Sequence, residues 1–198
     1  MKLAISVILA LAAICILPAV GEQTADYWST KARQLSLNGS YEEAVASYDR
    51  ALELDTSNAS LLIGKGLALA NLGKYNEAID IFDQALVSNS SNADALYFKG
   101  LALYNVGKLD DSLASFEAAI RINPLDPIRW NNKGVVLLEQ GKYEDARLSF
   151  DKALELDPNY VVAQKNKELT QQDRIQDNFY ELDDILYRAK QREGSLML

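Results

Sequence analysis

The chain has 198 residues, of which 48% are hydrophobic and 24% are charged, as is usual for a folded protein. Its net charge of −8 argues against a nucleic-acid-binding surface, because contacts to phosphates require clustered Lys and Arg. There is no histidine, and the single cysteine, Cys15, lies in the first 21 residues, so the usual general base, metal ligand and thiol nucleophile are missing elsewhere. We therefore expect no enzymatic activity, no metal or other cofactor, no nucleic acid and no small-molecule substrate.

Residues 1–21 have the pattern of a secretory signal peptide. Lys2 precedes an uncharged apolar stretch from Leu3 to Leu17, and the small residues Ala19 and Gly21 favour cleavage after Gly21. The alternative is an uncleaved anchor, because residues 3–20 carry no charge and are nearly long enough to span a bilayer. Both interpretations predict that the rest of the chain is secreted or extracytoplasmic, either free or tethered to the membrane by its N-terminus.

From residue 25 to residue 160 the sequence repeats at a constant step, the one that separates Gly39 from Gly73. Small residues, aromatic residues and glycines all follow this step, and the glycine series continues with Gly107 and Gly141. A constant step indicates one supersecondary unit copied four times, at 25–58, 59–92, 93–126 and 127–160. Such a unit cannot bury its apolar face alone and must stack on its neighbours.

Each unit predicts two helices. In the second unit, Leu62, Gly66 and Leu69 lie on one face of a first helix, which Gly73 ends in a left-handed conformation. The second helix opens with acidic residues that suit the helix dipole, and it carries a buried stripe made of Ala78, Phe82 and Ala85. The polar turns between units contain Asn-x-Ser triplets beginning at Asn38, Asn58 and Asn89. These are potential glycan acceptors, although we favour their interpretation as turn and cap residues.

The unit with Trp130, Gly134, Leu137, Gly141, Tyr143, Ala146, Phe150, Ala153 and Pro158 resembles a tetratricopeptide repeat. The resemblance covers residues 25–160 and implies an all-α fold, a right-handed α-solenoid of four helix pairs. It also implies that the first helices line a concave groove in which a protein or peptide partner binds. The chain differs from the family by placing a lysine before the small residue of every first helix, at Lys31, Lys65, Lys99 and Lys133. The second helices carry an equally regular row of acids, and we predict that the two rows form ion pairs that support the fold: Asp49, Asp83, Glu117 and Asp151.

The helix phases predict which side chains line the groove. Its middle is expected to be apolar and aromatic, which is typical of contact sites, and its asparagines could hydrogen-bond an extended peptide. The candidate residues are Ser29, Arg33, Ile63, Leu67, Tyr97, Phe98, Leu101, Tyr104, Asn131, Asn132 and Val135. The alternative is that the apolar members belong to the core. Of the positions that would form a carboxylate clamp in some tetratricopeptide modules, only Arg33 has suitable chemistry.

Residues 161–193 predict one or more C-terminal capping helices, and residues 194–198 a disordered tail. Glu168 falls where the repeats have a small residue, which favours a polar capping face. Within this region, Ile175, Phe179, Leu182, Leu186 and Ala189 follow heptad spacing. Segment 175–189 therefore either folds back on the fourth unit, which we favour, or pairs with another chain.

Together these features predict an extracytoplasmic protein-interaction scaffold. The alternative is a structural or assembly subunit of an envelope complex that self-associates through the stack ends and the C-terminal helix. A hydrolase using acid pairs such as Asp110–Asp111 is a third, much weaker interpretation, because these carboxylates are expected at a solvated helix start.

Overall fold

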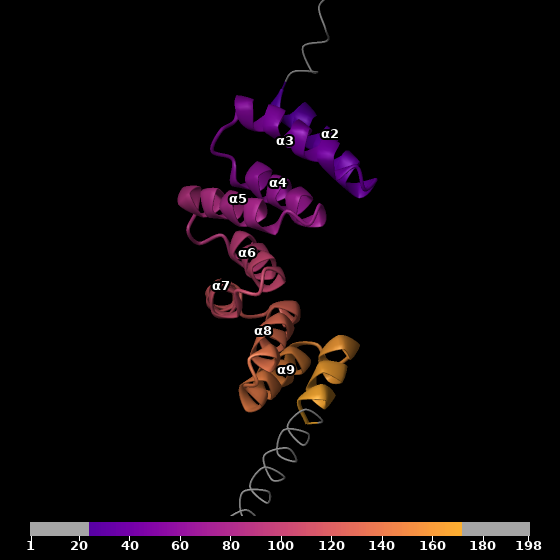
Figure 1. Cartoon of the computed structure of the whole chain (residues 1–198), viewed down its shortest axis with the longest axis vertical. Helices are drawn as coiled ribbons and strands as arrows, with labels where there is room; N and C mark the ends of the chain where they lie inside the picture. The colour runs from indigo at the N-terminus through magenta and orange to yellow at the C-terminus, as the bar shows by residue number, and fades with distance from the viewer. Residues whose placement is uncertain (1–23, 172–198) are drawn as a thin grey trace, which may run out of the picture. The chain divides into compact units, whose positions relative to one another are not determined.

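The computed structural model describes residues 24–171, and within that range all regular secondary structure is helical (Figure 1). The chain divides after Ser90 into two compact units. These compact units are larger than the four repeat units predicted above. We describe them separately, as unit 1 (residues 24–90) and unit 2 (residues 91–171). The predicted leader, segment 175–189 and the tail 194–198 lie outside the described residues. None of the helices in residues 24–171 has the length and apolar content needed to cross a membrane.

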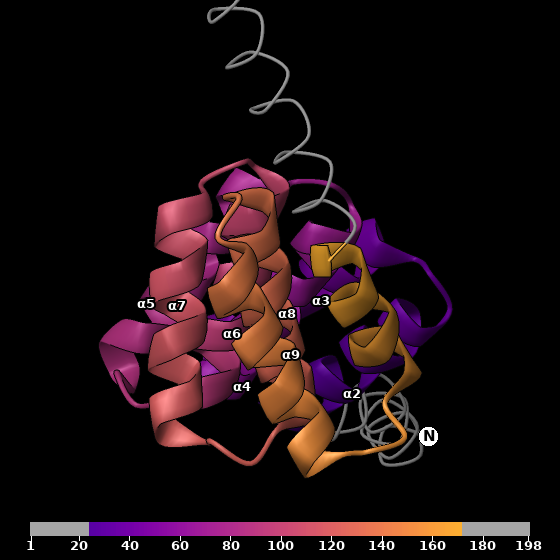
Figure 2. The same cartoon turned by 90° about the horizontal axis from the view of Figure 1, so that it is seen from below.

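Each unit contains two helix pairs. In unit 1 these are α2 (Ala25–Leu37) with α3 (Tyr41–Leu54), and α4 (Ala59–Asn71) with α5 (Tyr75–Ser88). In unit 2 they are α6 (Ala93–Asn105) with α7 (Leu109–Ile122), and α8 (Pro127–Glu139) with α9 (Tyr143–Leu156). A further helix, unlabelled in the figures, spans residues 161–171 and lies beside α9 (Figures 1 and 2).

Glycines on the first helices let them approach the aromatic rings of the second helices. Phe82, Phe116 and Phe150 are almost completely buried. A Cβ atom added to Gly66 would lie 2.5 Å from Cε1 of Phe82, and one added to Gly134 would lie 2.5 Å from Cε1 of Phe150. Atoms cannot approach this closely, so the small residues predicted in the packed stripe are a steric requirement of the pairing.

The ends of the first helices follow the predicted chemistry. All four end in a glycine with φ between 70 and 78°, a backbone conformation that other residues rarely adopt. The Asp126 side chain caps α8 by accepting a hydrogen bond from the Ile128 amide at 2.9 Å, with Pro127 at the first helical position. Asn58 caps α4 in the same way, accepting from the Ser60 amide at 3.0 Å, which fits its interpretation as a cap residue.

Ion pairs between the lysine row and the acid row link successive helix pairs. Within unit 1, Lys65 on α4 lies 2.6 Å from Asp49 on α3. Within unit 2, Lys133 on α8 lies 2.9 Å from Glu117 on α7. These contacts confirm the predicted pairing of the two rows at both junctions. Because the pairs are partly exposed, each is worth at most about 1 kcal/mol.

The helix at residues 161–171 continues the same arrangement. Lys167 lies 2.6 Å from Asp151 on α9, as Lys133 does at 2.9 Å from Glu117 one repeat earlier. Ala163 and Thr170 are buried, as are their equivalents one repeat earlier, Arg129 and Val136. This helix therefore docks on α9 as a fifth first helix, and Lys167 extends the lysine row beyond its four predicted members.

Candidate partner-binding surface

In unit 1, the predicted groove residues differ in their accessibility. Arg33 is exposed, and its Nη2 donates a hydrogen bond to Thr30 Oγ1 at 3.5 Å. Ile63 and Leu67 are half-buried on α4. Ser29 is buried, and its hydroxyl donates to the Asp26 carbonyl within its own helix at 3.0 Å. Contrary to the prediction, Ser29 therefore offers no contact surface, because it is buried and its hydroxyl is hydrogen-bonded inside α2.

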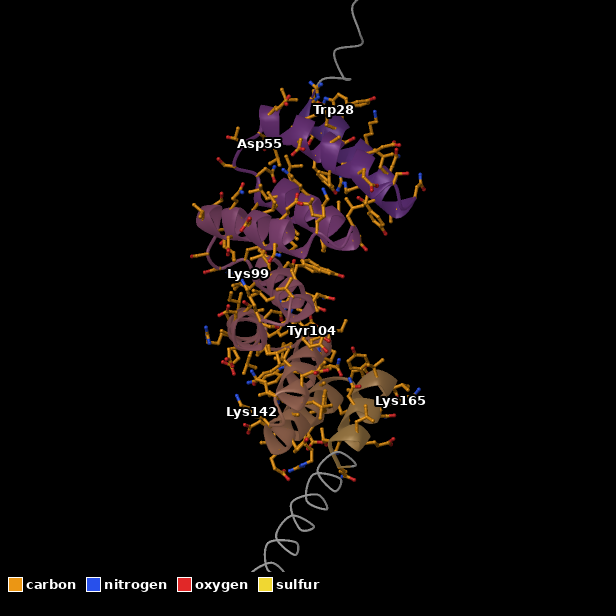
Figure 3. All side chains as sticks on the ribbon, in the orientation of Figure 1. Trp28, Asp55, Lys99, Tyr104, Lys142 and Lys165 are labelled. Carbon is orange, nitrogen blue, oxygen red and sulfur yellow. The ribbon has the colours of Figure 1, made fainter. Side chains whose placement is uncertain are left out.

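In unit 2, the apolar candidates both pack on the core and reach solvent. Phe98, Leu101 and Tyr104 on α6 and Val135 on α8 are all half-buried. Val135 packs against a buried cluster formed by Leu137, Ala146 and Phe150. Tyr104, labelled in Figure 3, donates a hydrogen bond from its hydroxyl to Glu139 Oε1 on α8 at 3.3 Å. Val135 thus packs on the core with one part of its side chain and exposes the other part, so it belongs to both predicted locations, groove and core.

A row of side-chain hydrogen bonds crosses the three first helices of unit 2. Asn166 Nδ2 donates to Asn131 Oδ1 at 2.9 Å, and Asn131 Nδ2 donates to Asn132 Oδ1 at 3.2 Å. Asn132 Nδ2 then donates to the Tyr97 hydroxyl oxygen at 2.8 Å. Asn131 is only 3% exposed, so it holds the row together and, contrary to the prediction, offers no free surface. Asn132 and Asn166 are half-buried and keep part of their surface accessible.

The most buried charge in unit 2, Arg129, was not among the predicted site residues. The Arg129 side chain is 6% exposed, and it donates to Asp94 on α6 at 2.6 Å and to Asp126 at 2.9 Å. Its guanidinium carbon lies 5.6 Å from the centre of the Tyr97 ring. Arg129 Nη1 is buried and has no hydrogen-bond partner among the described residues. The available signal was the repeat itself, since the equivalents of Arg129 one repeat before and one repeat after are Ala95 and Ala163.

The network also changes the chemistry of Tyr97. Burial raises the pKa of its hydroxyl above the usual value, and the nearby carboxylate of Asp126 raises it further. The hydrogen bond from Asn132 and the charge of Arg129 oppose this shift in the pKa. Tyr97 therefore stays protonated at neutral pH. Because its oxygen accepts from Asn132, its own proton can be donated to another group.

We call the described accessible residues of this region the first-helix surface of unit 2. Its members come from α6, α8 and the helix at 161–171, and they combine two hydrogen-bonding amides and two hydroxyls with a set of apolar side chains. They are Tyr97, Phe98, Leu101, Tyr104, Asn132, Val135, Asn166 and Leu169. Asn166 and Leu169 were absent from the predicted set, because that set ended at the fourth repeat.

Comparison with known proteins supports the assignment of the repeats. A family model described as "Tetratricopeptide repeat" matches residues 29–93, 63–127 and 97–161. The starts of these matches are separated by the same step as the predicted repeats, and together the matches cover more than half of the chain. A comparison with curated proteins finds no significant match.

Several solved structures have a similar fold. A crystal structure of MamA protein superposes with a TM-score of 0.70 at 20% identity, covering 78% of this chain and 84% of that one. A fragment of MamA from Desulfovibrio magneticus RS-1 gives a TM-score of 0.71 at 24% identity, covering 76% and 85%. Pseudomonas aeruginosa pilF gives 0.69 at 23% identity, covering 77% and 69%. At these identities the likeness shows the fold alone, and it confirms the predicted all-α tetratricopeptide class.

Proposed function

The chain belongs to the tetratricopeptide repeat family, and from this premise we propose that it is an extracytoplasmic scaffold that binds an extended segment of a partner protein. Tetratricopeptide proteins act as protein-interaction scaffolds, because stacked helix pairs present long surfaces made of equivalent positions. The segment is proposed to lie across the first-helix surface of unit 2. The residues of unit 1, Arg33, Ile63 and Leu67, are proposed as a second contact region.

The hydrogen-bond row is the observation that carries this proposal. Asn132 donates one N–H of its side-chain amide to Tyr97 and keeps a second N–H and a carbonyl lone pair for a partner. Asn166 donates one N–H to Asn131 and likewise keeps a second N–H and a carbonyl lone pair. These amides come from helices one repeat apart, so they offer donors and acceptors at two successive points along the surface. An extended main chain has donors and acceptors in alternation and can pair with both, whereas a helix has already used its own.

The apolar residues next to this row supply the contacts for side chains. Leu101, Val135 and Leu169 occupy equivalent positions of successive repeats on three first helices, and Leu169 is 44% exposed. Burial of such side chains at a contact contributes about 25 cal/mol per Å² of apolar area. We therefore propose a partner segment that alternates apolar residues, which point to this row, with residues recognised through their main chain.

Charge sets the class of partner. The Arg129 cation is buried and already paired with two carboxylates, and the chain as a whole carries a net charge of −8. A nucleic acid or a free carboxylate terminus would therefore meet a net negative protein. The proposed partner is a protein, with no nucleic acid or small-molecule substrate.

Peptide selection followed by a binding measurement tests the proposal. Peptides are selected on the full-length chain from a random displayed library, and their affinities are measured by fluorescence anisotropy. We expect the Phe98→Ala/Tyr104→Ala double variant and the Asn132→Ala variant each to weaken binding by about tenfold or more. Leu148→Ala is the matched control, because Leu148 is exposed on the second helix α9, away from the first helices. Equal binding by all variants would rule out the first-helix surface of unit 2.

The extracytoplasmic location is proposed from the leader alone. Lys2, the apolar stretch from Leu3 to Leu17 and the small residues before position 22 support export. Mass spectrometry of the protein purified from its native host distinguishes the two versions. A mature chain beginning at Glu22 indicates cleavage and secretion, whereas an intact Met1 in the membrane fraction indicates a tether through residues 3–20. An intact chain found only in the cytoplasmic fraction would contradict both.

A further inference from the structure

Each first helix that follows a second helix within its unit docks through the same three positions. On α4 these are Leu61, Lys65 and Ala68, on α8 Arg129, Lys133 and Val136, and on the helix at 161–171 Ala163, Lys167 and Thr170. In all three cases the outer two residues are buried. The central lysine lies 2.6–2.9 Å from a carboxylate of the preceding second helix. This set of contacts defines the docking interface between successive repeats.

Helix α2 presents the same positions, but they are uncovered among the described residues. Tyr27, Lys31 and Gln34 are all exposed, and they line a hollow of ≈ 530 Å³. Lys31 Nζ lies 5.0 Å from the centre of the Trp28 ring, so in the described part of the chain it contacts an aromatic ring where Lys65, Lys133 and Lys167 meet a carboxylate. We call Tyr27, Lys31 and Gln34 the α2 end face. Within residues 24–171, it has the shape and charge of a first-helix interface without a preceding second helix.

The second helices show what this interface accepts. Each carries an acid followed three residues later by Leu or Ile, as in Asp49 and Leu52 of α3. Leu52 packs on the cluster that contains Leu61, next to the Lys65–Asp49 ion pair. With their flanking positions, the second helices read apolar–x–x–aromatic–acid–x–Ala–Leu/Ile, except that Arg147 replaces the first apolar residue in α9.

A related pattern recurs once more in the sequence, outside the described residues, with Leu182 at the aromatic position and Ile185 at the alanine position. Phe179, Leu182, Asp183, Ile185 and Leu186 have the spacing of Val45, Tyr48, Asp49, Ala51 and Leu52. The helix at 161–171 is poorly suited to receive this stripe. Gln164, Glu168 and Gln171 are exposed on it, at the positions where the repeats place Leu or Trp, Gly or Ala, and Leu against their own second helix. Apolar side chains gain little from a polar face of this kind.

We propose that the α2 end face binds a second copy of this chain, which presents segment 175–189. Asp183 of the second copy pairs with Lys31, and Leu186 packs on Tyr27, in the way that Asp49 and Leu52 contact α4. Each acid of the acid row is followed by a lysine of the lysine row in the next first helix. Lys31 comes before the first of these acids, and Asp183 comes after the last of these lysines, Lys167. Lys31 and Asp183 are therefore the lysine and the acid that remain for pairing between two copies. Because the two surfaces differ, the contact is heterologous and joins copies head to tail into a ring or an open chain.

Charge exchange tests the proposal. The full-length chain is studied by sedimentation velocity over a range of concentrations, in a density-matched non-ionic detergent because of its apolar leader. We expect self-association that is weakened about tenfold by Lys31→Glu and by Asp183→Lys, since each change replaces an attraction by a repulsion. The Lys31→Glu/Asp183→Lys double variant is expected to recover the association of the original chain.

Two matched controls separate this contact from a general effect of charge. Asp184→Lys changes a neighbouring acid that lies off the pattern, and Lys74→Glu changes an exposed lysine before α5, so both are expected to associate like the original chain. Circular dichroism verifies that every variant remains helical. The proposal is overturned by a chain that is monomeric at all concentrations, by single variants that associate normally, or by a double variant as weak as the single ones.

Discussion

At the scale of single residues, the contact between a glycine and a ring sets the distance within each helix pair. Gly66 allows Phe82 to be fully buried, and there is no room for even one methyl group between them. The other second-helix positions are equally tight: Ser112, which replaces the usual alanine, is buried and donates to the Gly100 carbonyl at 2.8 Å. Small residues therefore determine how closely the two helices of a pair approach each other.

Gly66→Ala is expected to destabilise the chain by about 1–3 kcal/mol, although alanine favours helices, because the new Cβ overlaps the Phe82 ring. Denaturant unfolding followed by circular dichroism measures this cost. The second change Phe82→Leu should restore part of the loss in the Gly66→Ala background, while lowering the stability of the original chain. If Gly66→Ala raises stability instead, the packing described for α4 and α5 is wrong.

The caps give a second prediction at this scale. Asn58→Ala removes the side-chain acceptor of the Ser60 amide at the start of α4 and is expected to cost about 1 kcal/mol. Ser57→Ala, at the exposed neighbouring position, serves as the control and should change the free energy of unfolding very little. Equal effects of the two changes would show that the cap makes no net contribution.

At the scale of helices, the repeat made most of the fold predictable. Its constant step fixes the ends of the paired helices α2 to α9, because a glycine follows every first helix and a capping Thr, Asn or Asp precedes it. The lysine row and the acid row also predicted contacts between helices that are not paired with each other. A pattern within a single helix rarely allows such a prediction. The candidate site was harder to predict: phase alone places Asn131 beside Asn132, but only the packing of residues 161–171 shows that Asn131 is buried. Residues that depart from the repeat, such as Arg129, also indicated the site, but a comparison of the features that the repeats share does not reveal them.

Arg129 leads to an asymmetric prediction for the junction of α6 and α8. Arg129→Leu introduces the residue that unit 1 has at the equivalent position, Leu61, and is expected to change stability by less than about 1 kcal/mol. Asp126→Ala should cost about 3 kcal/mol, because it removes the cap of α8 and leaves a buried guanidinium with one partner fewer. Thermal and denaturant unfolding measure both changes. A larger cost for Arg129→Leu than for Asp126→Ala would reverse this account.

At the scale of the whole molecule, the described helices mainly contact those next to them in sequence. Stability in such a chain is close to a sum over repeats and their junctions, so a local change is felt mainly by its neighbours. The same organisation explains how one face can vary without loss of the fold: the core positions repeat strictly, whereas the first-helix surface changes from Ile63 and Leu67 in unit 1 to aromatic and amide residues in unit 2.

The titratable groups of the chain predict how its stability depends on pH. No histidine is present, so the free energy of unfolding should be nearly constant between about pH 6 and 8. Burial is the main cause that raises the pKa of Tyr48, Tyr97, Tyr104 and Tyr160. Each keeps its proton to a higher pH in the folded chain than in the unfolded chain. Their contribution is therefore complete below about pH 10, the unfolded value, and is lost as the pH rises through the folded one.

We accordingly expect the free energy of unfolding to fall as the pH increases above about 10. Denaturant unfolding at intervals between about pH 8 and 11 measures this slope. Tyr97→Phe should reduce the slope, because one tyrosine with a raised pKa is removed, even though it also deletes the hydrogen bond from Asn132 and lowers stability at neutral pH. If Tyr97→Phe lowers stability by the same amount at every pH, burial and the Asp126 carboxylate do not raise the pKa of the Tyr97 hydroxyl.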